Sequence, residues 1–207
     1  PATVSVTMLG KDGARPLAGA QSVAIDAGSV FDISLAGVPA GVYGVQVTSN
    51  TPVGAAVRLV RSAGEYPERS QALIHDQAWA QAALPGAADS GLLAVPRASS
   101  LTSAVTVANS GAATSVTLSS VDGSWSQDVA VAKGSAVVVE VPTEVAAVRL
   151  SAAGQESASG TSRTPSGLAA ATIVTAQAGG DLAGTLISTV PAQPDASVRA
   201  QRSILLG

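Results

Sequence analysis

A short strand-and-turn phrase occurs twice in this chain, as "SVTMLGKDG" at Ser5–Gly13 and as "SVTLSSVDG" at Ser115–Gly123. The residues before the first turn alternate in polarity, so that Val4, Val6 and Met8 share one face of an extended segment. Such a period of two is typical of a β-strand with one buried face. The Asp-Gly pair that follows tolerates a positive φ and suits a tight turn. The phrase therefore predicts a strand and a turn, each used twice.

The rest of the first half continues this pattern, with apolar runs separated by breaks that contain Gly or Pro. Strands are predicted at Thr3–Met8, Ser22–Ile25, Val30–Leu35, Val42–Thr48 and Val53–Val60. Strands and turns that recur about every ten residues, without long helical periodicity, favour an all-β sandwich of the immunoglobulin-like type.

The second half repeats the first with offsets that change only between the predicted strands. The matched positions are apolar on the same face: Phe31, Ile33 and Leu35 with Val137, Val139 and Val141; Val45 and Val47 with Val148 and Leu150; Leu73-Ile74 with Leu186-Ile187; and Leu92-Leu93 with Leu205-Leu206. Insertions confined to loops are typical of a duplicated unit. We therefore predict two tandem modules, residues 1–86 with a Trp-containing linker at 62–86, and residues 87–207.

The second module has a leading strand, Leu101–Ala108, that has no counterpart in the first. We expect the numbering to start one strand inside a module and the chain to be a fragment of a longer protein. A sandwich without an edge strand leaves backbone groups unpaired. The first module is expected to recruit a substitute, either the Ser197–Leu206 segment or a strand of a neighbouring chain.

Charge and composition narrow the classes of function. The net charge is −3 and the pI is about 5.0, which argues against nucleic acid, because phosphates require a concentrated basic surface. No apolar run reaches the ~20 residues of a membrane helix, so no membrane insertion is expected. The chain contains no cysteine, so disulfides and thiolate metal sites are excluded. We expect no cofactor.

Few residues offer catalytic chemistry. The single histidine, His75, has no G-x-S-x-G motif beside it, and histidine metal sites usually need two or three such ligands. Glu140 and Glu144 form a carboxylate pair of the kind that glycosidases use, but their place around a Pro-containing turn favours solvated charges. The segment Lys133–Ser135 lacks the rest of a phosphate-binding loop and is interpreted as a hairpin turn. The sequence therefore predicts that the protein is not an enzyme, with no catalytic or metal-binding residue.

One segment of the first module is richer in bulky and charged residues than its counterpart in the second. The candidate binding residues are Arg58, Arg61, Tyr66, Arg69 and Trp79. One interpretation is a binding surface with an aromatic platform and arginines for carboxylates. The other is that Trp79 fills the junction between the modules while the charges are solvated. Trp125, close to the second Asp-Gly turn, has the same two interpretations: it stacks on a sugar ring, or it packs over its own sheet.

The order of these phrases resembles a known family. The features are a leading strand that ends in Asn109, a "VTL…DG" hairpin at Val116–Gly123, a strand and turn at Val129–Ser135, and a "D-x-A-W" linker at Asp76–Trp79. Together they resemble an uncharacterised family of large actinobacterial proteins, exported or envelope-anchored, known only as a domain of unknown function. The resemblance implies export and tandem β-sandwich repeats, and it transfers no catalytic residue.

Two functions remain open. The first is a non-enzymatic, extracytoplasmic structural or adhesive module of a longer cell-envelope protein, whose partners are other domains of that protein or envelope components. The second is a module that binds carbohydrate or cell-wall glycan through exposed aromatic side chains. The exposure of Trp79, Tyr66 or Trp125 beside polar groups would favour the second, and full burial would remove it.

Overall fold

The computed structural model describes residues 1–62, 75–83, 88–153, 166–177 and 185–194. These residues form antiparallel β-sheets joined by turns and loops, with no helix among them. The all-β prediction is confirmed.

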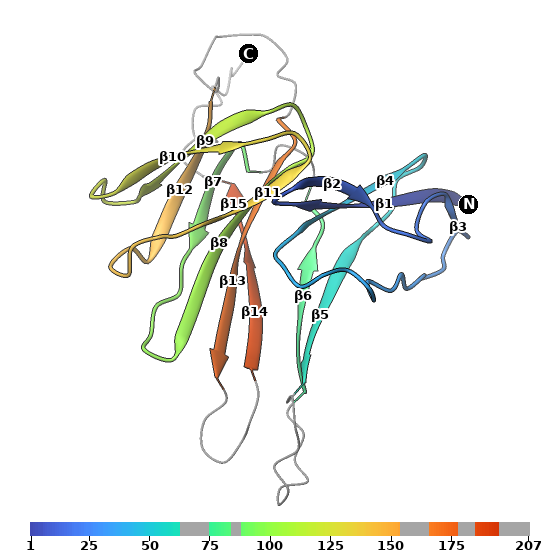
Figure 1. Ribbon diagram of the computed structural model, residues 1–207, viewed down its shortest axis with the longest axis horizontal. Helices are drawn as coiled ribbons and strands as arrows, with labels where there is room; N and C mark the ends of the chain where they lie inside the picture. Colours follow the sequence, from blue (N-terminus) through green and yellow to red (C-terminus); the bar gives the residue numbers. More distant parts are fainter. Residues whose placement is uncertain (63–74, 84–87, 154–165, 178–184, 195–207) are drawn as a thin grey trace, which may run out of the picture.

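The second half of the chain forms a two-layered β-sandwich (Figure 1). Its first sheet has the strand order β10–β9–β12–β7–β15, with β10 (Ser126–Val131), β9 (Thr114–Ser120), β12 (Ala147–Ala152), β7 (Ser90–Ala94) and β15 (Gln193–Pro194). Its second sheet has the order β11–β8–β13–β14, with β11 (Ser135–Val139), β8 (Leu101–Asn109), β13 (Leu168–Gln177) and β14 (Thr185–Pro191). Each sheet therefore receives one of the two consecutive strands β7 and β8.

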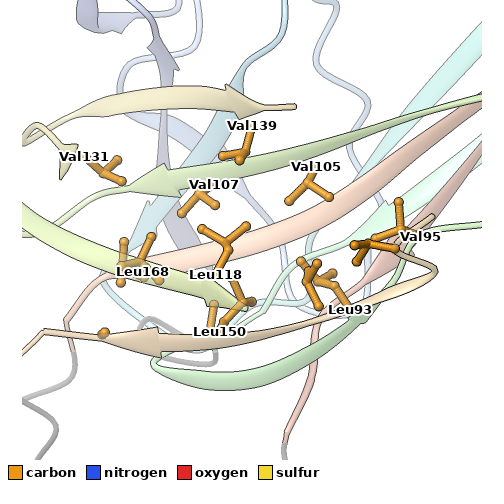
Figure 2. Close-up of a cluster of buried hydrophobic side chains, with 14 residues drawn as sticks. Leu93, Val95, Val105, Val107, Leu118, Val131, Val139, Leu150 and Leu168 are labelled. Carbon is orange, nitrogen blue, oxygen red and sulfur yellow. The ribbon is translucent and has the colours of Figure 1, made fainter. Parts of the chain in front are cut away.

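The core of this sandwich consists mainly of Leu and Val side chains that meet between the two sheets (Figure 2). Leu93 and Leu118 project from the first sheet and Val105, Val107 and Leu168 from the second. They are fully buried or nearly so, because the alternation of each strand places every second residue on the inner face. Burying a side chain of this size contributes about 1.5–3 kcal/mol.

The N-terminal sheet is built around β1 (Ala2–Gly10). One edge of β1 pairs with β2 (Gly13–Pro16) and β3 (Val23–Ile25), and the other edge pairs with β4 (Gly44–Ser49). Val4, Val6 and Met8 are buried on one face of β1, as the alternation predicts. The predicted Asp-Gly turns are also present, since Gly13 and Gly123 both adopt a positive φ.

A separate hairpin consists of β5 (Ala56–Ser62) and β6 (His75–Gln81), paired antiparallel in register. In Figure 1 it lies beside β14, and β6 is packed against β14. The buried core of the N-terminal sheet includes no residue of this hairpin. The described residues thus contain one two-sheet sandwich, and the tandem arrangement of two such modules stays a prediction. The boundary predicted between residues 86 and 87 lies outside the described residues.

Small residues bring the N-terminal sheet against the outer face of the sandwich. Leu9 forms a buried cluster with Ala108 of β8 and Ala136 of β11. A Cβ atom added to Gly44 would lie 2.5 Å from the Cβ of Ala108, and one added to Gly134 would lie 2.8 Å from that of Ala14. The close approach of the sheets therefore depends on glycine at both positions.

Strand pairing repeats between the two halves of the chain. The pairs β1–β2, β1–β4 and β5–β6 correspond to β9–β10, β9–β12 and β13–β14. This agrees with the duplication that the sequence indicates.

The strand predicted at Val30–Leu35 is wrong, because this segment is irregular. Its counterpart β11 pairs with β8, and the described part of the first repeat has no strand in the corresponding place. Val30 is 93% exposed and Phe31 55% exposed. A segment with strand propensity stays irregular here because it has no neighbour to pair with.

The interpretation of Lys133–Ser135 as a hairpin turn also needs correction. The strands that it joins, β10 and β11, belong to different sheets of the sandwich. The turn uses the positive φ of Gly134, whose N–H donates to the carbonyl of Asn109.

Candidate functional site

The candidate site is the exposed face of the β5–β6 hairpin. Residues paired directly across two antiparallel strands share a face. The pairs Ala56–Gln81, Arg58–Trp79 and Val60–Gln77 are all in register, and all six side chains are exposed. The face therefore presents one indole ring with a glutamine two residues to either side of it on β6.

Arg58 and Trp79, both predicted from the sequence, contact one another on this face. The guanidinium carbon of Arg58 lies 5.8 Å from the centroid of the Trp79 ring. This is the distance of a cation–π contact, which contributes about 0.5–1 kcal/mol at an exposed site. Trp79 remains 54% exposed in this contact.

The interpretation in which Trp79 fills a junction between modules is wrong, because its ring is exposed. β6 meets β14 instead through hydrogen bonds, one of which the Trp79 carbonyl accepts from the Thr189 hydroxyl at 3.0 Å. Small side chains face the other way on this strand, and Ala78 is buried. Strand alternation therefore sends the large ring outwards.

The remaining candidates of this segment are placed only in part. Arg61 is exposed on β5 and lies opposite Asp76. Asp76 has a structural role, since its carboxylate accepts hydrogen bonds from the N–H groups of Ile187 and Gln77. Tyr66 and Arg69 lie outside the described residues.

Trp125 is half-buried against the sandwich core. The backbone N–H of Trp125 donates a hydrogen bond to the Ser120 hydroxyl at 2.9 Å, and the Trp125 carbonyl accepts one from the Ser120 backbone N–H. This favours the interpretation in which the ring packs over its own sheet.

The turn beside Trp125 holds an exposed carboxylate. Hydrogen bonds from the Ser120 hydroxyl and from the N–H and hydroxyl of Ser124 lower the pKa of Asp122 from 3.8 to about 2. They stabilise the charged form of the carboxylate and fix the turn.

The sequence reasoning missed two structural polar residues. The Arg97 guanidinium donates to three carbonyls of the Val141–Val145 turn. Glu140, which precedes this turn, and Glu144, which lies within it, are both exposed. The side chain of Asn109 is fully buried and bonds to the backbone of Gly111, Ala112 and Val131. From the sequence, Asn109 was identified only as the end of the leading strand. The role of Arg97 was not predicted, because its partners lie 44–48 residues away in the chain.

Comparison with known families gives one match. Residues 1–142 match a family of unknown function, DUF5719. The chain belongs to this family. The match to DUF5719 extends from β1 through β11, and so includes the hairpin with Arg58 and Trp79. No curated protein and no solved structure shows significant similarity to the chain.

In the described part of this DUF5719 chain, no three His, Asp or Glu side chains lie close enough together to hold a metal ion. None of the described elements is a helix of the length and apolarity needed to cross a membrane. The chemistry that the hairpin face itself offers is stacking on the indole and hydrogen bonding to the neighbouring amides and the guanidinium.

Proposed function

We propose that this protein is a non-enzymatic, extracytoplasmic module of a longer cell-envelope protein, with a structural or adhesive role. The observation that carries the proposal is the close contact between the N-terminal sheet and the sandwich at Gly44 and Ala108. Together with the packing of β6 on β14, it supports a stiff arrangement of sheets that spaces or docks other parts of a protein. Function in such modules lies in the surface and not in the fold.

Cell fractionation tests the location. With an antibody against this chain, the protein is expected in the envelope or the culture medium of its source organism. A cytoplasmic marker enzyme serves as the control. Recovery of the chain with that marker would overturn the proposal.

A second candidate, binding of cell-wall glycan, is favoured by the exposed hairpin face. An indole that is 54% exposed and flanked by exposed Gln77 and Gln81 suits a sugar ring, which offers an apolar face for stacking and hydroxyl groups for hydrogen bonds. The Arg58 guanidinium adds a donor for a carboxylate on the glycan.

Co-sedimentation with insoluble cell-wall material tests this candidate. Trp79→Ala is expected to abolish binding. Phe31→Ala is the matched control, because it removes an equally exposed aromatic ring from a segment outside the hairpin. Equal loss in both variants would mean non-specific adhesion, and no binding by the unaltered chain would leave the structural role alone.

A further inference from the structure

The two repeats differ in the edges of their sheets. In the second repeat, β7 covers one edge of β12 and β8 covers one edge of β13. The counterparts of β12 and β13 in the first repeat are β4 and β5. Each of these two pairs with a single strand among the described residues. Within the described ranges, the first repeat therefore leaves unpaired two strand edges that are paired in the second repeat.

The free edge of β5 presents the backbone groups of Ala56, Arg58 and Val60. The Ala82 N–H donates to the Ala55 carbonyl, and hydrogen-bonded pairs alternate along an antiparallel ladder. Val57 and Leu59 therefore bond to β6, while the residues between them direct their N–H and C=O groups away. The corresponding residues of β13 are Ala169, Ala171 and Ile173, which face β8.

The free edge of β4 presents the backbone groups of Val45 and Val47. The Asn50 N–H donates to Thr3, so the alternate residues Gly44, Gln46 and Thr48 bond to β1. In the second repeat the equivalent residues, Val148 and Leu150, face β7. Both free edges therefore match the edges that β7 and β8 occupy.

Apolar side chains of the first repeat are also exposed. Val60 is 56% exposed, and Val30 and Phe31 belong to the irregular segment whose counterpart β11 pairs with β8. A strand placed beside β5 would give this segment the neighbour that it lacks. Exposed apolar groups beside an unpaired strand edge are the usual site of strand addition.

We propose that the first repeat binds an extended segment of polypeptide that supplies one strand to the edge of β5 and one to the edge of β4. The occupant has the chemistry of Ser90–Asn109: two short strands of alternating small and branched apolar residues, joined by a Pro-containing turn. These residues themselves fill both equivalent edges of the second repeat, where β7 pairs with β12 and β8 pairs with β13.

The duplication also fixes the register. In the second repeat Ile173 lies opposite Ala104 and Ala171 opposite Thr106. The bound strand therefore places its Ala104 opposite Val60 and its Thr106 opposite Arg58. One residue further along, Val105 of the bound strand faces the other side of the sheet.

The test uses the full chain and a synthetic peptide with the sequence of residues 90–109. The peptide is expected to raise the Tm of the chain with saturation at one peptide per chain, and to slow amide hydrogen exchange at residues 30–35. A peptide of the same composition in shuffled order is the control. Val60→Pro removes the N–H that points to the unpaired edge of β5 and leaves the hydrogen bonds between β5 and β6 in place. This variant should abolish the rise in Tm, while Val60→Ala should retain it.

Because the chain has no cysteine, disulfide trapping can read the register. A Val60→Cys chain should cross-link to a peptide carrying Ala104→Cys and not to one carrying Val105→Cys. The proposal is overturned if the peptide has no effect on Tm, if the Val60→Pro chain binds it equally, or if both cysteine peptides cross-link alike.

Discussion

The Asp76 carboxylate of β6 accepts a hydrogen bond from the backbone N–H of Ile187 in β14, with 2.6 Å between Oδ2 and N. The two residues are 111 positions apart in the chain. The bond joins strand edges that do not form a continuous β-ladder. One side chain of the first repeat thus satisfies a backbone donor of the second.

Asp76→Ala should lower the free energy of unfolding by about 1–3 kcal/mol, because the N–H of Ile187 loses a charged acceptor. Chemical denaturation checks this. Gln77→Ala, an exposed neighbour, is the control and should stay within about 0.5 kcal/mol. An equal effect of the two variants would remove the role assigned to Asp76.

Gly44→Ala should destabilise the chain by about 1–3 kcal/mol, because the added Cβ meets that of Ala108 at 2.5 Å. Gly54→Ala is the control, since a Cβ there meets no atom within 4 Å. In a double-mutant cycle, adding Ala108→Gly should recover part of the loss. Strict additivity of the two changes would mean that the residues are not in contact.

Asn109→Ala should cost about 3 kcal/mol or more, because the backbone groups of Gly111, Ala112 and Val131 each lose a buried partner. Asn50→Ala provides the comparison. The exposed Asn50 side chain accepts a hydrogen bond from the Thr3 N–H, and water can take its place as the acceptor. Thermal unfolding should rank the two variants in that order. The reverse order would contradict the role given to Asn109.

Trp79→Ala should change stability by less than about 1 kcal/mol, because the ring is exposed and loses only the contact with Arg58. Leu118→Ala, in the core of Figure 2, should cost about 2–5 kcal/mol. If Trp79→Ala lowered the free energy of unfolding as much as Leu118→Ala, the interpretation in which Trp79 is buried between the modules would be restored.

The Asp122 carboxyl should titrate near pH 2 in the folded chain, against about 3.8 when unfolded. Because folding lowers this pKa, the contribution of Asp122 to stability is fully present above pH 3.8 and is lost as the pH falls towards 2. A carboxyl-carbon NMR titration measures the midpoint. Ser124→Ala should raise it towards 3.8, and Ser126→Ala should leave it unchanged; no rise in the first variant would contradict the assigned cause.

Alternation along single strands was enough to predict much of the fold. Val4, Val6 and Met8 are buried on one face, and the Asp-Gly turns follow where expected, because these features depend on neighbours a few residues away. The candidate site was predicted in part: Arg58 and Trp79 meet on one hairpin, although no spacing in the sequence says that they contact one another.

What the sequence by itself determined is the local periodicity and the Asp-Gly turns, since strand alternation and turn chemistry act within a few residues. Only the tertiary structure decided whether Val30–Leu35 forms a strand, which way the Trp79 ring points, and how β6 meets β14. The physical reason is that a β-strand completes its hydrogen bonds with another strand, which is often distant in the sequence. A segment of strand-forming residues therefore becomes a strand only where the fold gives it a partner.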